Sequence, residues 1–286
     1  MTKKALLIGI NDYAPVGPGG PDLRGCVNDV RDMANTLSVL GIVPATPGAM
    51  RILTDARATR SAILTGFQWL ISGAKKGDVL IFYYSGHGSQ VADVSGDDPD
   101  GRDETICPHD FSTAGMIKDD DFRASLAGLP AGVNLDIIFD SCHSGSATRE
   151  LAEFATACLE GTIAYRYIEP PLDWGFFLDA DPKLLVRHIL RPKSQVATKD
   201  AVVVPRLNHV LWAGCRDNQT SAEDLIGGTY RGVFTYNFCK ILRRAGVAIT
   251  RRRLDSQVTL NVRGMGYNQI PQMEGTITSF AEKVFT

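Results

Sequence analysis

The chain has 286 residues, which is enough for one large α/β domain or two smaller domains. Its net charge of −2 and hydrophobic content of 44% are ordinary for a globular protein and give no case for general binding to nucleic acid or an anionic membrane. Its apolar runs fall far short of the roughly 20 residues of a membrane span. The six cysteines lack CxxC spacing, which disfavours a zinc site and a disulfide framework.

A short apolar run over 4–10 predicts the first strand. Two lysines precede it, but the run is too short for the apolar part of a signal peptide, and polar Asn11-Asp12-Tyr13 follows without a small-residue cleavage site. We therefore expect a cytoplasmic protein.

The next segments alternate between the periods of helices and strands. Apolar residues at helical spacing predict helices over 25–40 and 59–74, and short apolar runs predict strands over 51–54 and 79–84. Residues 89–121 are rich in aspartate, so we expect a solvated or metal-binding loop there.

The alternation continues through the rest of the chain, except over 149–201. That segment keeps no regular period and contains several prolines, so we expect a linker or insertion. The remaining predictions are strands over 135–140, 208–214 and 269–275, and helices over 121–129, 232–245 and 251–262. Alternating strands and helices predict a mostly parallel sheet with helices on both faces.

Two predicted strands end in residues that carry chemistry. Residues 79–84 lead into Ser85-Gly86-His87-Gly88, and residues 135–139 lead into Asp140-Ser141-Cys142-His143. Because parallel strands present their carboxyl ends at one edge of a sheet, we expect His87 and Cys142 to meet there.

This pair suits thiol catalysis. Cys142 would be the nucleophile, His87 the base that activates it, and the backbone amides of Gly88 and Cys142 the donors to an oxyanion. His143 is the less suitable base, because consecutive residues rarely face each other productively.

The segments Tyr84–Ser89 and Asp140–Gly145 resemble the two catalytic motifs of metacaspases, the caspase-like cysteine peptidases of bacteria, plants, fungi and protists. Further matching segments are Leu6–Asn11, Leu23–Asp29, Gly214–Ala222, Gly232–Tyr236 and Pro271–Gly275. The resemblance covers nearly the whole chain and is to the prokaryotic type without a prodomain. It implies an α/β fold, namely a caspase-like three-layer α/β/α sandwich with a mostly parallel central sheet.

The resemblance also implies how the chain is divided. Residues 1–148 would form the larger part with the catalytic His and Cys, 149–201 the linker or insertion, and 202–286 the smaller part that completes the same domain. The implied activity is cleavage after Arg or Lys by a Cys–His dyad through an acyl-enzyme. The implied partners are protein or peptide substrates, with no nucleic acid and no membrane, and the chain would be a monomer.

In this family the positions matching Cys26, Asp29, Ser85 and Asp140 bind the basic side chain of the substrate. Two carboxylates can accept a guanidinium and would repel an acidic side chain. An acid that ends an apolar strand, as Asp140 does, also needs a cationic or hydrogen-bonding partner when it is buried. Asp29 could instead be an exposed helix acid.

Many metacaspases are activated by calcium, and the matching ligands here are Asp103, Asp120 and Asp121. Calcium would act as an activator, with no cofactor for the chemistry itself. The position of a fourth family ligand holds Arg149, and the neighbouring Glu150 is a possible substitute. Alternatively, the segment is a solvated acidic loop, with Asp119 as a helix cap.

A protease that cuts after basic residues could process itself between 149 and 201. The candidate residues in that range are Arg149, Arg166, Lys183, Arg187, Arg191, Lys193 and Lys199. An ordinary surface loop that is never cut is the alternative. Two other functions also remain open, a caspase-like scaffold or regulatory binding protein with little activity, and an esterase or transferase that uses the same dyad.

Overall fold

The computed structural model describes residues 1–14, 22–92, 102–142, 164–166, 168, 197–198, 201–203, 209–216, 219 and 221–286. Its centre is an eight-stranded sheet in the order β2-β1-β3-β7-β11-β14-β10-β9. In that order the strands are Met50–Thr54, Lys3–Gly9, Val79–Ser85, Asn134–Asp140, Val210–Ala213, Gln272–Gly275, Ala201–Val203 and Ala197–Thr198.

The first five strands of this order, β2 to β11, pair in parallel. Strand β3 lies between β1 and β7, and all seven of its residues are buried, as a continuous apolar run predicts. Beyond β11 the pairing with β14 and that of β10 with β9 are antiparallel. The predicted mostly parallel sheet is therefore confirmed.

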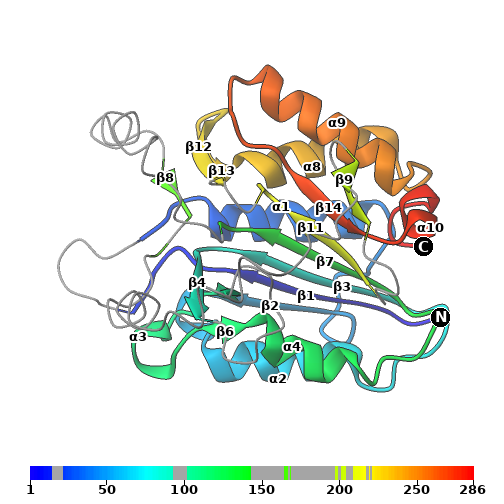
Figure 1. The fold of residues 1–286 in the computed structure, drawn as a ribbon, viewed down its shortest axis with the longest axis horizontal. Helices are drawn as coiled ribbons and strands as arrows, with labels where there is room; N and C mark the ends of the chain where they lie inside the picture. The colour runs from blue at the N-terminus through cyan, green and yellow to red at the C-terminus, as the bar shows by residue number, and fades with distance from the viewer. Residues whose placement is uncertain are drawn as a thin grey trace, which may run out of the picture.

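Helices cover both faces of the sheet (Figure 1). On one face lie α1 (Cys26–Val39), α8 (Val233–Ala245) and α9 (Arg251–Gly264), and on the other lie α2 (Arg60–Ile71) and α4 (Asp119–Leu126). Short helices are the 3₁₀ turn Asp55–Arg57, α3 (Phe111–Ala114) and α10 (Ile277–Ala281). The arrangement is the three-layer α/β/α sandwich that was predicted.

The sheet divides the core in two, because successive side chains of a strand point to opposite faces. Leu7 and Ile81 pack with α1 and α8, whereas Leu6 and Phe82 pack with the aromatic residues of α2 and α4. Helix α1 buries residues at positions 26, 29, 30, 33 and 37, which is the stripe of an amphipathic helix. One member of this buried stripe is an acid, Asp29.

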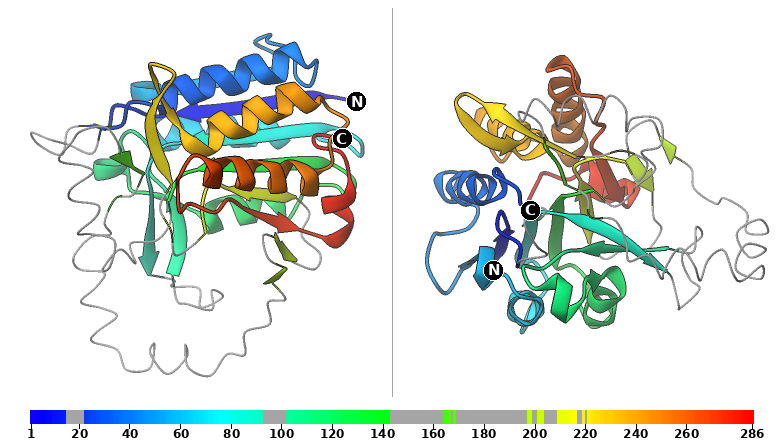
Figure 2. Two further views of the ribbon diagram at one scale, coloured as in Figure 1. Left: turned by 90° about the horizontal axis from the view of Figure 1, so that it is seen from above. Right: turned by 90° about the vertical axis from the view of Figure 1, so that its left-hand side faces the viewer.

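Two small antiparallel sheets lie beside the carboxyl ends of the parallel strands (Figure 2). One contains β13 (Thr229–Gly232), β12 (Ala222–Ile226) and β8 (Ala164–Tyr165), and the other contains β4 (Gly88–Ala92), β5 (Arg102–Ile106) and β6 (Ile117–Lys118). The second sheet corrects the prediction of a loop over 89–121. In Arg102-Asp103-Glu104-Thr105-Ile106 the charged residues precede a buried pair, so the acidic composition hid strands that are buried only in part.

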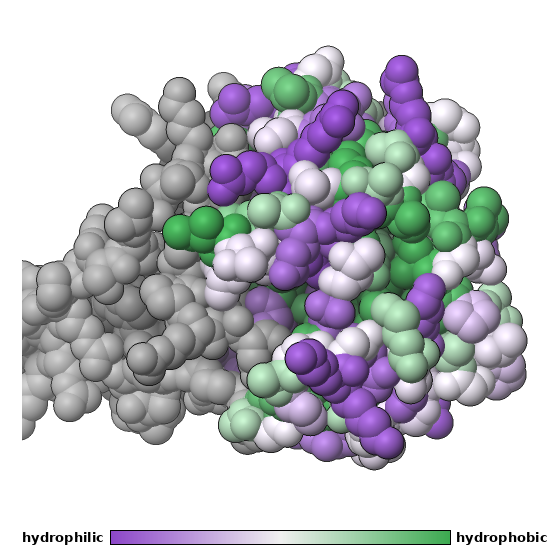
Figure 3. Space-filling model, turned by 90° about the vertical axis from the view of Figure 1, so that its right-hand side faces the viewer, coloured by the Kyte–Doolittle hydropathy of each residue, from purple (hydrophilic) through white to green (hydrophobic). Residues whose placement is uncertain are grey.

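The opposite end of the molecule, where both termini lie, has hydrophilic side chains spread over its surface with small apolar groups between them (Figure 3). Within the described ranges, no helix is long and apolar enough to cross a membrane.

Candidate active site

Strands β3 and β7 carry His87 and Cys142 to the same edge of the sheet. The two strands pair in parallel from Val79 with Asn134 to Ser85 with Asp140. His87 lies two residues beyond Ser85, and Cys142 lies two residues beyond Asp140, so the register places both at the same level. The register thus gives the common edge that the sequence predicted.

The His87 turn is fixed by two buried tyrosines. The backbone N–H of His87 donates to the Tyr13 hydroxyl at 2.7 Å, and the Tyr84 hydroxyl donates to the His87 carbonyl at 2.6 Å. The Tyr13 ring also packs against the imidazole, with ring centroids 4.9 Å apart. A side chain at Gly86 would lie within 2.6 Å of both hydroxyls, so only glycine fits there.

Cys142 is buried, and its thiol contacts the backbone of Ser221. The Ser221 N–H donates to Sγ, and Sγ lies 3.4 Å from the Ser221 carbonyl oxygen. The backbone amides of Cys142 and Gly88 both donate to one carbonyl oxygen, that of Arg166, at 3.2 Å and 3.0 Å. Two amides, one from the start of β4 and one just after β7, therefore converge on one acceptor beside the thiol. This is the arrangement of donors that binds an oxyanion.

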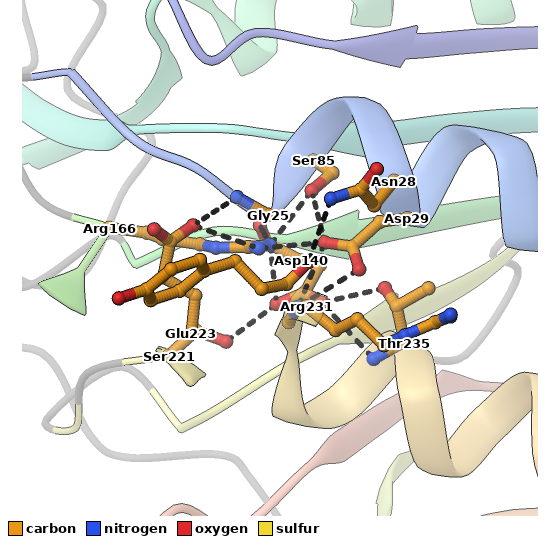
Figure 4. A network of polar contacts seen from close by, with 12 residues as sticks. Gly25, Asn28, Asp29, Ser85, Asp140, Arg166, Ser221, Glu223, Arg231 and Thr235 are labelled. Atoms are coloured by element: carbon orange, nitrogen blue, oxygen red, sulfur yellow. Dashed lines mark hydrogen bonds and ion pairs between the residues drawn. The ribbon is translucent and has the colours of Figure 1, made fainter. Parts of the chain in front are cut away.

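The side chain of Arg166 lies fully buried among acids (Figure 4). Its guanidinium lies 2.7 Å from Asp29 Oδ2, 3.1 Å from Asp140 Oδ1 and 3.6 Å from Glu223 Oε2, and it donates to Ser85 Oγ at 2.8 Å. We call the carboxylates of Asp29, Asp140 and Glu223, together with the Ser85 hydroxyl, the acidic cluster. Three carboxylates face one guanidinium, so a cation is strongly favoured at this position.

Backbone and hydroxyl donors hold the Asp140 and Glu223 carboxylates in place. Asp140 accepts from the Ser221 hydroxyl at 2.7 Å and from the Thr235 hydroxyl at 2.6 Å. Glu223 accepts from the backbone N–H groups of Arg24 and Gly25 at 2.8 and 3.0 Å. These donors keep the acids directed at the guanidinium.

The third acid, Asp29, is held by the backbone of Gly232. It accepts from the backbone N–H of Gly232 at 2.9 Å. A Cβ at position 232 would lie 2.2 Å from Asp140 Oδ2 and 2.8 Å from both Asp29 Oδ2 and the guanidinium of Arg166. The absence of a side chain at Gly232 therefore leaves room for the basic group.

Burial changes the acidity of the groups around the guanidinium. Removal from water raises the pKa of Asp29 to about 6, with a further increase from Asp140, whereas the Arg166 guanidinium lowers it. Burial also raises the pKa of the Cys26 thiol well above its usual range, so this thiol is neutral at physiological pH. The site thus holds Asp29, whose carboxyl group can gain a proton near pH 6, and the uncharged Cys26 thiol, beside the carboxyl groups of Asp140 and Glu223.

Comparison with known proteins identifies the family of the chain. The family model described as metacaspase, peptidase C14 domain, matches residues 3–150. The chain belongs to the metacaspase family. Metacaspase-1 of Pyricularia oryzae is 34% identical over 302 residues, which cover 95% of this chain and 71% of that protein. Metacaspase-1 of Coccidioides immitis is 35% identical over 263 residues, which cover 85% of this chain and 55% of that protein.

The fold agrees with this assignment. The crystal structure of protein GSU0716 from Geobacter sulfurreducens matches with a TM-score of 0.66 and 27% identity, over 100% of this chain and 99% of that chain. The chain spans only about half to seven tenths of the length of the two fungal metacaspases.

The structure brings together the residues that the metacaspase resemblance assigned to catalysis and to the pocket, namely Cys26, Asp29, Ser85, His87, Gly88, Asp140 and Cys142. Two participants were not foreseen. Glu223 directly follows the matching segment Gly214–Ala222, in a stretch for which no element or role was predicted, and Tyr13 was taken only as a polar residue after the first strand. Arg166 was named as a basic residue of the linker, without a place in the site.

The calcium ligands expected in metacaspases are described only in part. The side chains of Asp103 and Asp120, and the whole of Glu150, lie outside the described residues. Asp121 forms an ion pair with Arg60 at 2.8 Å and accepts from the backbone N–H of Lys118. Among the described residues, no group of three or more His, Cys, Asp and Glu side chains is arranged to hold a metal ion.

Proposed function

We propose that the chain is a cysteine endopeptidase that cleaves peptide bonds after Arg or Lys. The observation that carries the proposal is the position of Arg166. Its guanidinium lies in the acidic cluster while its own carbonyl oxygen accepts from the amides of Gly88 and Cys142. An arginine of a substrate bound in the same way would present its carbonyl carbon to the Cys142 thiol.

The proposed reaction uses the two residues at the sheet edge. His87 takes the proton of the Cys142 thiol, and the thiolate attacks the carbonyl carbon of the residue held in the acidic cluster. The amides of Gly88 and Cys142 stabilise the negative charge on the carbonyl oxygen. His87 then protonates the leaving amine, and water hydrolyses the thioester to release the new carboxyl end.

Charge and shape both support a basic residue before the cut. Asp29 pairs with one terminal nitrogen of the guanidinium and Asp140 with the other, and a lysine ammonium could pair with the same carboxylates through fewer contacts. An acidic side chain would be placed against three buried carboxyl groups, at a cost of several kcal/mol. The acidic cluster therefore supports cleavage after Arg first, Lys second and Asp not at all.

Calcium stimulation is a further part of the proposal. Strands β5 and β6 pair through Thr105 and Lys118, which brings the backbone around Asp103 close to that around Asp120. Calcium binding there would neutralise carboxylates and hold strands β5 and β6 together beside the His87 turn, without taking part in the bond cleavage. Because Asp121 is paired with Arg60, its use as a ligand requires that ion pair to open.

A panel of fluorogenic peptides tests the proposal. The peptides differ only in having Arg, Lys or Asp before the bond, and each is assayed with millimolar calcium and with chelator. We expect hydrolysis of the Arg and Lys peptides, more with calcium, and none by the Cys142→Ala variant. Equal hydrolysis by Cys142→Ala would remove the dyad, and hydrolysis of esters alone would favour the esterase alternative. Binding of Arg peptides without turnover would favour the scaffold alternative.

Calcium binding needs its own measurement. Isothermal titration of calcium into Cys142→Ala should show binding, and adding Asp121→Asn should weaken it. The matched control adds Asp12→Asn instead, because Asp12 is an acid elsewhere in the chain. No heat at millimolar calcium, together with full activity in chelator, would reject the calcium part and leave the peptidase proposal intact.

A further inference from the structure

We infer that the peptide bond after Arg166 is the chain's own first substrate, cut by Cys142 of the same molecule. This inference rests on the proposed function and assigns one bond within the 149–201 segment. Three independent contacts of the chain around Arg166 carry it, namely those of its backbone, its carbonyl group and its side chain.

The backbone on both sides of Arg166 is bound as a substrate strand would be. Strand β8 pairs antiparallel with β12, with Tyr165 opposite Ala222 and Ala164 opposite Glu223. The Arg166 N–H donates to the Ser221 carbonyl at 3.2 Å, and the Ile168 N–H donates to the Gly88 carbonyl at 3.0 Å. Main-chain pairing to a strand edge is a general way of holding an extended peptide.

The carbonyl group of Arg166 is in the position where the reaction would occur. Its oxygen receives both converging amides, from Gly88 at 3.0 Å and from Cys142 at 3.2 Å. The thiol contacts the same Ser221 carbonyl that accepts from the Arg166 N–H. The thiol and the Arg166 backbone therefore share a partner, which places them side by side.

A purely structural role for Arg166 does not account for its carbonyl contacts. Arg251 is the useful contrast, because it also is buried and pairs with a buried acid, Asp136, at 3.0 Å. Arg251 is the first residue of helix α9, its backbone N–H donates to the Glu282 carbonyl, and its side chain also pairs with Glu282, so its contacts are those of a structural ion pair. At Arg166 the ion pairs, the strand pairing and the two amides all orient the same peptide unit.

The inferred step balances as an ordinary hydrolysis. Sγ of Cys142 forms a bond to the carbonyl carbon of Arg166, and the bond to the nitrogen of Tyr167 breaks as His87 gives that nitrogen its proton. Water then adds to the thioester, a proton returns to His87, and the thiolate leaves. The products are a chain that ends in the Arg166 carboxylate and a chain that begins with the Tyr167 amine.

The same contacts would block the binding of other peptides to the site as long as the chain is uncut. With Arg166 in the acidic cluster, a peptide added from outside has no access to Asp29, Asp140 or the two amides. We therefore expect cleavage after Arg166 to be intramolecular and first-order, and activity on added peptides to rise with the cut. The lag should not depend on protein concentration.

The experiment follows fragments and added-peptide hydrolysis together, with millimolar calcium present. Four chains are compared: the natural sequence, Cys142→Ala, Arg166→Gln, and Arg187→Gln as a matched control from the same segment. Arg166→Lys is added because it keeps the buried positive charge if Arg166→Gln folds poorly. N-terminal sequencing of the fragments identifies the cut bond.

We expect a new N-terminus of Tyr-Ile-Glu-Pro from the natural chain and from Arg187→Gln, slower cutting in Arg166→Lys, and none in Cys142→Ala. Arg166→Gln should remain uncut at this bond and hydrolyse an added Arg peptide without a lag. An intact natural chain, or cuts only elsewhere in 149–201, overturns the inference. If only the inference about Arg166 is wrong, Arg166→Gln or Arg166→Lys still hydrolyses the added Arg peptide. If neither the natural chain nor any variant hydrolyses that peptide, the proposed function fails as well.

Discussion

The hydroxyl of Tyr13 accepts a hydrogen bond of 2.7 Å from the backbone N–H of His87, although 74 residues separate them in sequence. Tyr13 follows the first strand, and His87 follows β3, which pairs with it along its whole length. The hydroxyl thus fixes the backbone from which the proposed base projects, while the tyrosine ring packs on the imidazole.

Replacing Tyr13 by Phe should show whether the tyrosine hydroxyl positions His87 for catalysis without affecting the binding of the substrate. The change leaves the ring contact but removes the partner of a buried N–H, which costs about 1–3 kcal/mol. If part of that cost appears as misplacement of His87, kcat for Arg peptides should fall about tenfold with KM nearly unchanged. Tyr236→Phe, on α8, is the control and should match the natural chain in steady-state kinetics.

The space left by Gly232 gives a prediction about the basic residue. In Gly232→Ala the new methyl group would overlap Asp140 Oδ2 and approach Asp29 Oδ2, although the φ of −65° suits any residue. Overpacking of this kind costs about 1–3 kcal/mol, so kcat/KM for Arg peptides should fall about 10- to 100-fold.

The same substitution should also slow cleavage after Arg166. Gly48→Ala, where a methyl group meets no atom within 4 Å, is the control for both effects. An unchanged kcat/KM in Gly232→Ala would mean that substrates do not use the space in which the Arg166 guanidinium lies.

Glu223 is the member of the acidic cluster that the sequence did not identify. Its carboxylate bonds two backbone N–H groups and lies 3.6 Å from the guanidinium. In Glu223→Gln the charge is lost and an amide N–H₂ must face those donors or the guanidinium. We expect kcat/KM to fall about tenfold for Arg peptides. Asp224→Asn, next in sequence and bonded to Tyr267, should leave peptide hydrolysis unchanged.

The pKa of Asp29 gives a pH prediction whose sign follows from proton release. Burial raises this pKa to about 6 and the Arg166 guanidinium lowers it, so we expect the pKa to be higher once that guanidinium is removed. Binding of an arginine side chain then expels a proton, and affinity rises with pH by at most about tenfold per unit until Asp29 is fully ionised.

Isothermal titration of an Arg peptide into the double variant Cys142→Ala, Arg166→Ala measures this, because the site is empty and no cleavage occurs. Affinity should increase between pH 5.5 and 7.5, and buffers of different ionisation enthalpy should report the released proton. Adding Asp29→Asn should weaken binding and flatten the pH dependence. A pH-independent affinity with Asp29 present would contradict the assignment.

The parts of the site that could be predicted were those with a local pattern. Apolar runs ending in Asp140 and in Ser85 predicted that Cys142 and His87 follow neighbouring strands at one edge of the sheet, and the parallel pairing of β3 with β7 gives that arrangement of the backbone. The contacts of Tyr13, Glu223 and Arg166 join residues 74, 198 and 137 apart to His87, Gly25 and Asp29, and no local period encodes such distances. The strands inside the acidic segment were missed because composition hid their short alternation.

A buried ion pair away from the site joins helix α9 to strand β7 of the central sheet. Arg251 at the start of α9 forms two bonds with Asp136 of β7, at 3.0 and 3.1 Å, and Trp212 of β11 donates to the same carboxylate at 3.0 Å. Arg251→Met would leave Asp136 buried without its cation, which costs about 3–5 kcal/mol. Urea unfolding should show a lower midpoint by that amount, and Asp136→Asn added to Arg251→Met should recover a large part of it. If the double variant is no more stable than Arg251→Met, the arginine contributes through packing on α9 and not through the charge of Asp136.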